Sequence, residues 1–578
     1  MSDTKQLYTK YAKTLLEDRV LPEYPRPQLV RDSFENLNGF WDYHVDKQPL
    51  IPEHYDGKIL VPFPIESLLS KVNKRLEADD FLIYRRFFEL PKKFQKDLVF
   101  LNFQAVDQNA TVYLNQKKLG THQGGYFPFS LDITDGLREK NELVVIVSDP
   151  TNSSYSAFGK QSLNPGGIFY TPVTGIWQTV WLESVAKNHM KNLKILPDFD
   201  QSEVKITLEG TLEPQGIIKI YSKQKLILEK KFKTAENIVA LPNFIPWTPE
   251  NPHLYEVTVE LKNDFVKSYF GMRKWALGEG KYGKALFLNN QGIFLSGVLD
   301  QGFWSDGLYT PASDEALVDD IQLMKSMGFN TLRKHVKVEP LRWYYHCDRL
   351  GMIVWQDFVN GGKVSIPKMM ILPNIGFKGI DDEKSLDSFG RGTEESRAAF
   401  FEEIKQNVSL LGNSPSVGLW TIFNEGWGQF QSQKAYDFLK ALDPSRIIDA
   451  ASGWFDQGGP DLASIHTYFK KINVEKGARP VALSEFGGYS CKIPDHAYHL
   501  TKEYGYRKFK DPKTLEAAVV NLYQGEVIPN IKKGLCAAIY TQLSDVESET
   551  NGLITYDRGI VKITPMVMKS LNDEIKKT

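Results

Sequence analysis

"VGLWTIFNE", residues 417–425, decides the fold. This run is almost entirely apolar and ends abruptly in Asn424 and Glu425. A short apolar run that stops at polar residues is typical of a strand buried on both faces, as in a parallel sheet. Seven further strand-like runs of this kind lie beyond residue 280, at 293–298, 329–335, 352–358, 446–452, 463–469, 481–488 and 536–544.

Helical patterns alternate with these strands, most clearly in "SDEALVDDIQLMKSMGF" (313–329). Ser313 is suited to cap this helix, and Leu317, Ile321 and Met324 share one face of it. Eight strands alternating with helices predict a (β/α)8 TIM barrel over residues 277–578, although some connections, especially after the fifth strand, lack an obvious helix.

Two long stretches follow predicted barrel strands, 359–400 after the third and 489–520 after the seventh. Loops after barrel strands lie at the C-terminal face, where the active sites of this fold are built. We therefore expect both stretches to border a functional site.

The chain before the barrel has the pattern of two β domains. "LVFLNFQAV" (98–106), "ATVYLNQKKLG" (110–120) and "ELVVIVSDP" (142–150) are short β-rich runs, and "LNQKKLG" within the second indicates a hairpin turn. We predict a β-sandwich of the jelly-roll type over 1–184. Alternating strands then predict a smaller immunoglobulin-like sandwich over 185–276.

Charge and cysteine content exclude several classes of function. Lys plus Arg is 70 and Asp plus Glu is 71, so no net field favours nucleic acid or an anionic membrane. The three cysteines are far apart and form no Cys-x-x-Cys pair, which disfavours a disulfide framework or a zinc site. The amino terminus lacks an apolar signal region, and no apolar run reaches the ~18 residues of a membrane span. We expect a soluble, cytoplasmic protein.

Two glutamates end matching barrel strands. Glu425 ends the fourth strand, and Glu485, in "VALSEFGG", ends the seventh. Burying an isolated carboxylate is costly, so a function should compensate for it. Two carboxylates at opposite sides of one barrel mouth can flank a glycosidic bond, one as acid and one as nucleophile or base. The alternative is that each only caps a strand or pairs with a lysine.

"FNEGWG" and "LSEFGG" resemble the acid/base and nucleophile motifs of barrel glycosidases with Asn-Glu on strand four and Glu on strand seven. The rest of the chain resembles glycoside hydrolase family two, which includes β-galactosidases, β-glucuronidases and β-mannosidases. The similar segments occur in the family's order from end to end, and they are "NLNGFWDYHVD", "VPFPIES", "YRRFFELP", "HQGGYFPFSLDIT", "GIWQTVWLESV", "WTPENPHLYEV", "SYFGMRKW", "GFNTLRKH" and "CDRLGMIVWQDF".

The resemblance implies roles for five residues. Glu425 would be the general acid/base and Glu485 the nucleophile. Asn424 would bind the sugar 2-hydroxyl, Arg333 would keep the nucleophile ionised, and Tyr468 would donate a hydrogen bond to it. The family retains anomeric configuration, so the two carboxyl groups should lie roughly 5 Å apart.

Further residues are candidates for contact with the substrate, each with a structural alternative. Trp427 either gives the acid/base an apolar environment or simply packs, and Asp300 either binds hydroxyls or caps a loop. His466 is either a site residue or a satisfied core histidine. The remaining candidates end strands two, three and eight, and they are His335, Asp357 and Tyr540.

The motifs indicate the reaction but do not identify the sugar. Strand eight offers Tyr540 where many relatives have a Trp platform, "LDQGFW" replaces a His-rich segment of β-galactosidases, and the Asn-x-Lys element of glucuronidases is missing. We expect a retaining exo-β-glycosidase. A β-galactoside is the first expectation for its substrate, and a β-glucuronide, β-mannoside or arabinoside is the alternative. A transglycosidase and a non-catalytic carbohydrate-binding protein are the rivals. Neither a metal nor another cofactor is expected. Members of the family often form oligomers, so the resemblance suggests a homo-oligomer.

Overall fold

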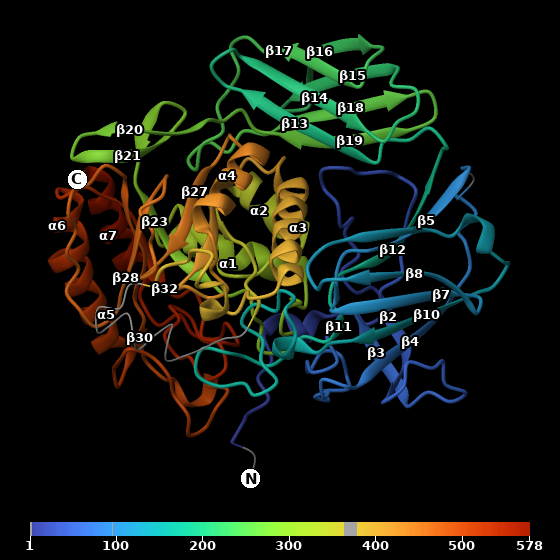
Figure 1. Cartoon of the computed structure of the whole chain (residues 1–578), viewed down its shortest axis with the longest axis horizontal. Helices are drawn as coiled ribbons and strands as arrows, with labels where there is room; N and C mark the ends of the chain where they lie inside the picture. Colours follow the sequence, from blue (N-terminus) through green and yellow to red (C-terminus); the bar gives the residue numbers. More distant parts are fainter. Residues whose placement is uncertain (1–2, 95, 363–378) are drawn as a thin grey trace.

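The computed structural model describes residues 3–94, 96–362 and 379–578. Figure 1 shows two β-sandwiches, one in blue and teal at the right and one in teal and green at the top. A barrel in yellow to red lies beside both of them. The three units therefore follow one another along the chain, in the order that the sequence predicts.

The first unit is a sandwich of two antiparallel sheets. The six-stranded sheet contains, in spatial order, β3 (Gly57–Val61), β2 (Gly39–Asp46), β4 (Phe81–Phe88), β10 (Asn141–Ser148), β7 (Asn109–Leu114) and β8 (Lys117–Gln123). The four-stranded sheet contains β1 (Phe34–Asn36), β12 (Val180–Val185), β5 (Leu98–Phe103) and β9 (Phe129–Asp132), and a separate small pair joins β6 (Val106–Asp107) to β11 (Gly175–Ile176).

The predicted hairpin in "LNQKKLG" is confirmed. β7 pairs antiparallel with β8, and the two residues between them, Asn115 and Gln116, have φ values of 50° and 71°. Positive φ at both central positions is the geometry of the tight turn that matches strand twist. On β7 the buried residues alternate, with Ala110, Val112 and Leu114 facing the core of this sandwich.

The second unit is a smaller sandwich with its own core. One sheet contains β13 (Asn192–Asp198), β14 (Glu203–Glu209) and β17 (Glu236–Ala240). The other contains β16 (Lys225–Phe232), β15 (Gly216–Ser222), β18 (Tyr255–Leu261) and β19 (Phe265–Phe270). The domain boundaries given above remain predictions.

A small antiparallel sheet packs against the barrel interior. It contains β20 (Trp275–Gly280), β21 (Gly283–Leu288) and β22 (Gln291–Ile293). Trp275 and Leu286 of this sheet share a hydrophobic cluster with Trp355 and Leu419 of the barrel strands. The cluster fills the barrel with apolar side chains, as the fold requires.

The barrel has the eight parallel strands that the sequence predicts. They are, along the chain, β23 (Leu295–Asp300), β24 (Thr331–Lys334), β25 (Ile353–Asp357), β26 (Val417–Asn424), β27 (Ile447–Ser452), β28 (Ala463–Thr467), β29 (Val481–Gly487) and β32 (Leu535–Thr541). Their hydrogen-bonded order is β27-β26-β25-β24-β23-β32-β29-β28, so the barrel is closed except between β27 and β28.

Helices surround this barrel. The α-helices are α1 (Asp314–Ser326), α2 (Leu341–Leu350), α3 (Glu394–Leu411), α4 (Ser432–Leu442), α5 (Pro512–Leu522), α6 (Ile528–Ile531) and α7 (Pro565–Lys577). Short helical turns are η1 (Lys10–Thr14), η2 (Thr134–Gly136), η3 (Thr151–Ser153), η6 (Leu386–Phe389), η7 (Pro494–His496) and η8 (Tyr523–Val527). The predicted cap of α1 is confirmed, because the Ser313 side chain accepts a hydrogen bond from the Ala316 amide.

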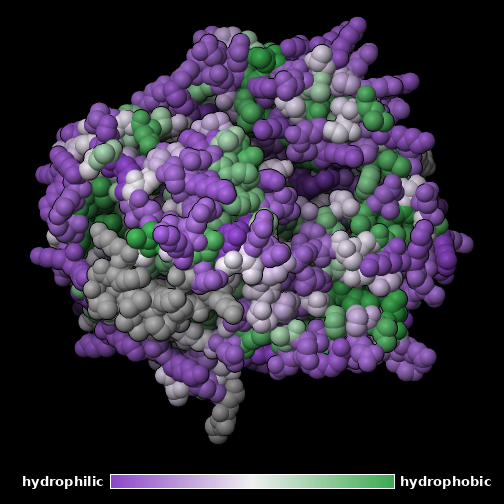
Figure 2. All heavy atoms as spheres, viewed as in Figure 1, coloured by the Kyte–Doolittle hydropathy of each residue, from purple (hydrophilic) through white to green (hydrophobic). Residues whose placement is uncertain are grey.

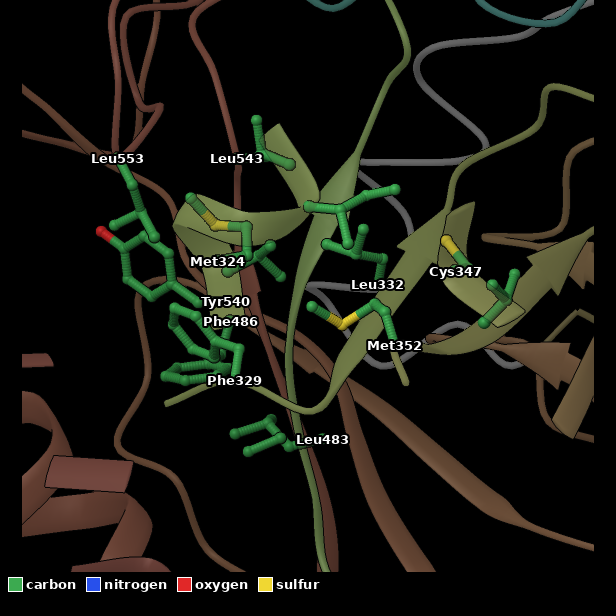
Figure 3. Close-up of a cluster of buried hydrophobic side chains, with 14 of the residues drawn as sticks. Met324, Phe329, Leu332, Cys347, Met352, Leu483, Phe486, Tyr540, Leu543 and Leu553 are labelled. Atoms are coloured by element: carbon green, nitrogen blue, oxygen red, sulfur yellow. The ribbon is translucent and has the colours of Figure 1, made fainter. Parts of the chain in front are cut away.

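The outer core lies between the barrel strands and the helices. Figure 3 shows Met324 of α1 near Phe329, Phe486 and Tyr540. Leu317 and Ile321 belong to the same cluster, as the predicted helix face requires. The ring of Tyr540 meets that of Phe486 edge to face at a centroid distance of 5.6 Å.

Of the two long stretches, the first lies partly outside the described residues, which omit 363–378. Its end forms η6 and the start of α3. The second contains η7, the start of α5, and the short strands β30 (Tyr489–Ser490) and β31 (Arg507–Lys508), which pair with each other.

The outer surface is mainly polar. The face in Figure 2 is largely hydrophilic, with hydrophobic residues scattered over it rather than collected in one band. In the part of the chain that the structure describes, each helix is too short or too polar to cross a bilayer.

Candidate active site

Strand β26 ends in a backbone conformation that presents Glu425. Glu425 has φ 53°, a left-handed value that costs a non-glycine residue about 1–3 kcal/mol and clusters at functional sites. Its amide donates to the Ser452 carbonyl of β27. Gly426 follows with φ 75°, and a Cβ there would lie 2.4 Å from the Phe455 ring. The turn therefore needs glycine immediately after the carboxylate.

The two predicted carboxylates meet at the barrel mouth. A carboxylate oxygen of Glu425, one of Glu485 and a ring nitrogen of His466 lie within 4.8 Å of one another. Glu425 and Glu485 are only 6% and 4% exposed. The strand-end positions read from the sequence thus become one buried pair.

His466 joins the two carboxylates. Its Nδ1 lies 2.8 Å from Glu425 Oε1, and its Nε2 lies 2.9 Å from Ser452 Oγ and 3.5 Å from Glu485 Oε1. The Trp454 ring meets the imidazole edge to face at 5.6 Å. His466 therefore lies beside the carboxylates with a partner for each ring nitrogen, and its role in substrate contact stays a prediction.

Arg333 is the central cation and is fully buried. Its guanidinium donates to Asp357 Oδ1 at 3.0 Å, Asn424 Oδ1 at 2.8 Å and Glu485 Oε1 at 3.2 Å. A planar guanidinium with five donors suits this fan of acceptors. The contact with Asn424 occupies its amide oxygen and leaves its amide nitrogen available to a ligand.

Glu485 is held in its ionised form. Burial raises the pKa of Glu485, but the charges of His466 and Arg333 outweigh burial and bring the pKa well below its usual range. The Tyr468 hydroxyl also donates a hydrogen bond to Glu485 Oε2. A carboxylate stabilised in this way is ready to act as a nucleophile.

His335 and Asp357 form a second layer beside Arg333. His335 Nδ1 lies 2.7 Å from Asp357 Oδ2. Burial raises the pKa of Asp357, but Arg333 and then His335 lower it more strongly. Asp357 therefore offsets part of the Arg333 charge through the Nε contact, and it orients His335.

Two predicted residues do not join the carboxylates. Asp300 accepts from Lys334 Nζ at 2.6 Å and from the Gly302 amide at 2.9 Å, so it belongs to a separate ion pair. Tyr540 points into the outer core, against Phe486 and Tyr523. Asp300 on β23 and Tyr540 on β32, which the sequence suggested as sugar contacts, therefore have their side chains in other interactions.

Trp427 packs against the first sandwich. Its ring lies 5.5 Å from that of Phe158 and 5.6 Å from that of Phe169, both from the loop that precedes β11. Val336 completes the cluster. Trp427 therefore packs, as one of its two readings expected, and it joins the barrel mouth to the N-terminal unit.

Four residues near this mouth were not singled out from the sequence. Trp454 lies two residues after the end of the fifth predicted strand, so its position was a usable signal. Tyr506 lies in the second long stretch and stacks on Tyr468 at a centroid distance of 3.6 Å and an angle of 8°. Lys160 and Glu549 lie in loops without any pattern that marks them, and only the fold reveals them.

Glu425, Glu485 and His466 are also the one group among the described residues with the spacing of metal ligands. Glu485 already faces the Arg333 guanidinium, which opposes a cation at the same oxygens. A metal ion at this group is therefore disfavoured.

Comparisons with known proteins identify the family of the chain. The model for the TIM barrel domain of glycosyl hydrolases family 2 matches residues 282–486. The model of its galactose-binding domain-like unit matches 68–166, and a further model for glycosyl hydrolases family 2 matches 183–273. The chain belongs to glycosyl hydrolase family 2.

Curated relatives differ in the sugar that their names carry. A putative β-glucuronidase of Formosa agariphila is 26% identical over 444 residues, 68% of this chain and 48% of that protein. A β-galactosidase of Lactococcus lactis is 25% identical over 457 residues, 72% of this chain and 42% of that protein. The chain spans less than half the length of either relative.

Solved structures show the same fold. A β-glucuronidase of an uncultured Clostridium superposes with a TM-score of 0.73 at 16% identity, over 95% of this chain and 99% of the other. A β-galacturonidase from Eisenbergiella tayi, bound to galacturonate, superposes with a TM-score of 0.69 at 17% identity, over 97% of this chain and 99% of the other.

Proposed function

We propose that this protein is a retaining β-glycosidase that removes a terminal sugar by double displacement. The observation that carries the proposal is the buried pair Glu425 and Glu485, with carboxylate oxygens within 4.8 Å of each other. Retaining enzymes place their two carboxyl groups about 5–5.5 Å apart, whereas inverting enzymes leave room for a water at about 6.5–9.5 Å.

Glu485 is the nucleophile in this proposal. Its carboxylate attacks the anomeric carbon while the bond to the leaving oxygen breaks, and Glu425 gives that oxygen its proton. Glu425 then takes a proton from water, the water oxygen attacks the anomeric carbon, and the bond to Glu485 breaks. The low pKa of Glu485 supports its role, because attack requires the ionised form.

Three neighbours support the pair. Arg333 keeps Glu485 ionised and fixes Asn424 through the amide oxygen. The free Asn424 amide nitrogen then donates to the sugar 2-hydroxyl, a contact that strengthens at the transition state. The Tyr468 hydroxyl donates a hydrogen bond to Glu485 Oε2. This hydroxyl can move when the carboxylate of Glu485 loses its charge on forming the glycosyl bond.

The family alone does not decide the sugar. Prevalence in the family favours a β-galactoside, and the names of relatives include β-glucuronidases and β-galactosidases. We also keep a cytoplasmic location and a homo-oligomer as proposals; three free, buried cysteines support the first.

A panel of para-nitrophenyl α- and β-glycosides tests the proposal. Wild-type protein should cleave at least one β-glycoside, and Glu485→Gln should lose about 10⁴-fold or more of that activity, as removal of a nucleophile does. Glu256→Gln, at an exposed position of β18, is the matched control and should keep full activity. Undiminished activity in Glu485→Gln would refute the assignment of the nucleophile.

A further inference from the structure

A loop of the first sandwich is fastened to the barrel mouth. It runs between β10 and β11, and the amides of Phe158 and Gly159 both donate to the Asn360 carbonyl at 3.1 Å. Gly159 has φ 61°, and a Cβ there would lie 2.7 Å from the carbonyl oxygen of Val336, the residue after His335. The loop backbone therefore sits directly against the end of β24, and it carries Lys160 as its next residue.

The backbone is fixed on the other side of Lys160 as well. The Tyr170 amide donates to the Lys160 carbonyl at 2.8 Å. The Gln161 side chain donates to Asp107 at 2.8 Å and accepts from the Val173 amide at 2.6 Å. Lys160 is thus presented from a rigid support rather than from a free loop.

The Lys160 side chain has no polar partner among the described residues. It is 7% exposed, and its ammonium lies 5.6 Å from the centroid of the Phe169 ring. Phe169 in turn contacts Trp427, whose indole nitrogen is buried and also lacks a partner in the described ranges. The Trp427 indole N–H is therefore a buried donor without a partner, and the Lys160 ammonium, whose nitrogen is not fully buried, contacts the same aromatic ring. A buried donor without a partner is costly unless a ligand completes it.

The Lys160 charge acts on the barrel mouth. Burial lowers the pKa of His335, Asp357 opposes this, and Lys160 lowers it further. Burial raises the pKa of Glu549 to about 7, against a hydrogen bond from Tyr170 and the charge of Lys160. Glu549 makes no ion pair with Lys160, so within the described part of the chain the ammonium is without a fixed counter-ion.

We propose that Lys160 binds the carboxylate of an acidic sugar, so that the substrate is a β-uronide such as a β-glucuronide or β-galacturonide. The inference rests on the proposed function and names its substrate class. A carboxylate supplies the counter-ion that the Lys160 ammonium lacks among the described residues, and it has a second oxygen for the Trp427 indole N–H. A neutral hydroxyl would leave the charge uncompensated. The cation comes from the first sandwich, which explains why the barrel motifs alone did not indicate it.

Binding tests the inference without turnover. The full chain with Glu485→Gln is titrated calorimetrically at pH 7 with para-nitrophenyl β-glucuronide, β-galacturonide, β-glucoside and β-galactoside. We expect one uronide to bind about 10- to 100-fold more tightly than its neutral counterpart, the range for a hydrogen bond to a charged group. Adding Lys160→Met should abolish that preference and leave the neutral sugars unchanged. Tighter binding of a neutral sugar would overturn the inference.

Kinetics separate recognition from structure. In the wild-type background Lys160→Met should lower kcat/KM for the uronide about 10- to 100-fold, Lys160→Arg should retain part of it, and the exposed Lys140→Met should have no effect. An equal loss on uronide and neutral substrates would show a structural role and refute the inference. Hydrolysis of neutral β-glycosides only would refute it while the proposed function stands. Uronide binding that depends on Lys160 without any hydrolysis would refute the function and support the inference.

Discussion

Removing the Tyr468 hydroxyl should make the enzyme lose activity at a higher pH. In the proposed mechanism the carboxylate of Glu485 attacks the sugar, so kcat/KM should fall as pH drops through the pKa of Glu485. Burial raises that pKa, and the charges of His466, Arg333 and His335 together with the Tyr468 hydrogen bond lower it well below its usual range. In Tyr468→Phe one of these stabilising contacts is gone, so the pKa rises and the acid limb moves upward.

The size of the shift follows from that contact. A hydrogen bond to a charged group contributes about 1.5–3 kcal/mol, and one pKa unit corresponds to about 1.4 kcal/mol. Since the other groups around Glu485 remain, we expect the acid limb to move by about 1 pH unit, the lower end of this range. The residue is 8% exposed, so water cannot readily replace the lost donor.

The assay is kcat/KM from pH 2 to pH 8 on the best substrate of the panel, because the pKa of Glu485 is lowered to about 2. Tyr540→Phe is the matched control, because Tyr540 is a buried tyrosine whose ring packs in the outer core away from the carboxylates. It should leave the acid limb in place. An unchanged limb in Tyr468→Phe, or an equal shift in both variants, would refute the reasoning.

Three other changes have defined outcomes. Glu425→Gln should lower the rate on an alkyl β-glycoside about 10²- to 10⁴-fold. It should spare the first step on a dinitrophenyl β-glycoside, which is observed as a burst of phenolate. Equal losses on the two substrates would contradict the role of Glu425 as the acid. Trp427→Ala should cost about 3–5 kcal/mol in chemical denaturation, since it empties the cluster with Phe169. A change of only about 0.5 kcal/mol, as for an ordinary surface substitution, would exclude this packing. Burial raises the pKa of Asp314, but its contacts with Arg342 and His346 lower this pKa overall. The ionised Asp314 therefore stabilises the fold above the unfolded-state pKa, and this stabilisation is lost as pH falls through the folded-state pKa. Asp314→Asn should therefore lower the melting temperature at pH 7, and the difference from the wild type should shrink as pH falls below the usual pKa range of an aspartate. A difference that stays constant with pH would argue against the ion pair.

The fold was readable from the sequence because its signals are local. Buried parallel strands are continuous apolar runs, and all eight barrel runs became strands. Glu425 and Glu485 were found for the same reason: each ends such a run, and parallel strands of a barrel bring their ends to one face. Ser313 capped its helix as its position before the apolar face indicated.

Side-chain partners were harder to infer because they depend on direction. Asp300 ends a strand like the glutamates do, yet its side chain meets Lys334. Tyr540 also lies near a strand end but faces the helices. Lys160 belongs to a different domain and reaches the mouth only through the packing of its loop against Asn360, which no local pattern records.

The most direct test of the account is to find where a trapped sugar is attached. The wild-type protein is incubated with the dinitrophenyl 2-deoxy-2-fluoro-β-glycoside of the sugar that the panel identifies, digested with pepsin and analysed by mass spectrometry. The account predicts one sugar per chain, on the peptide that contains Glu485 and on that carboxylate. A sugar on any other residue, or turnover without a covalent adduct and with inverted configuration in the product, would contradict it.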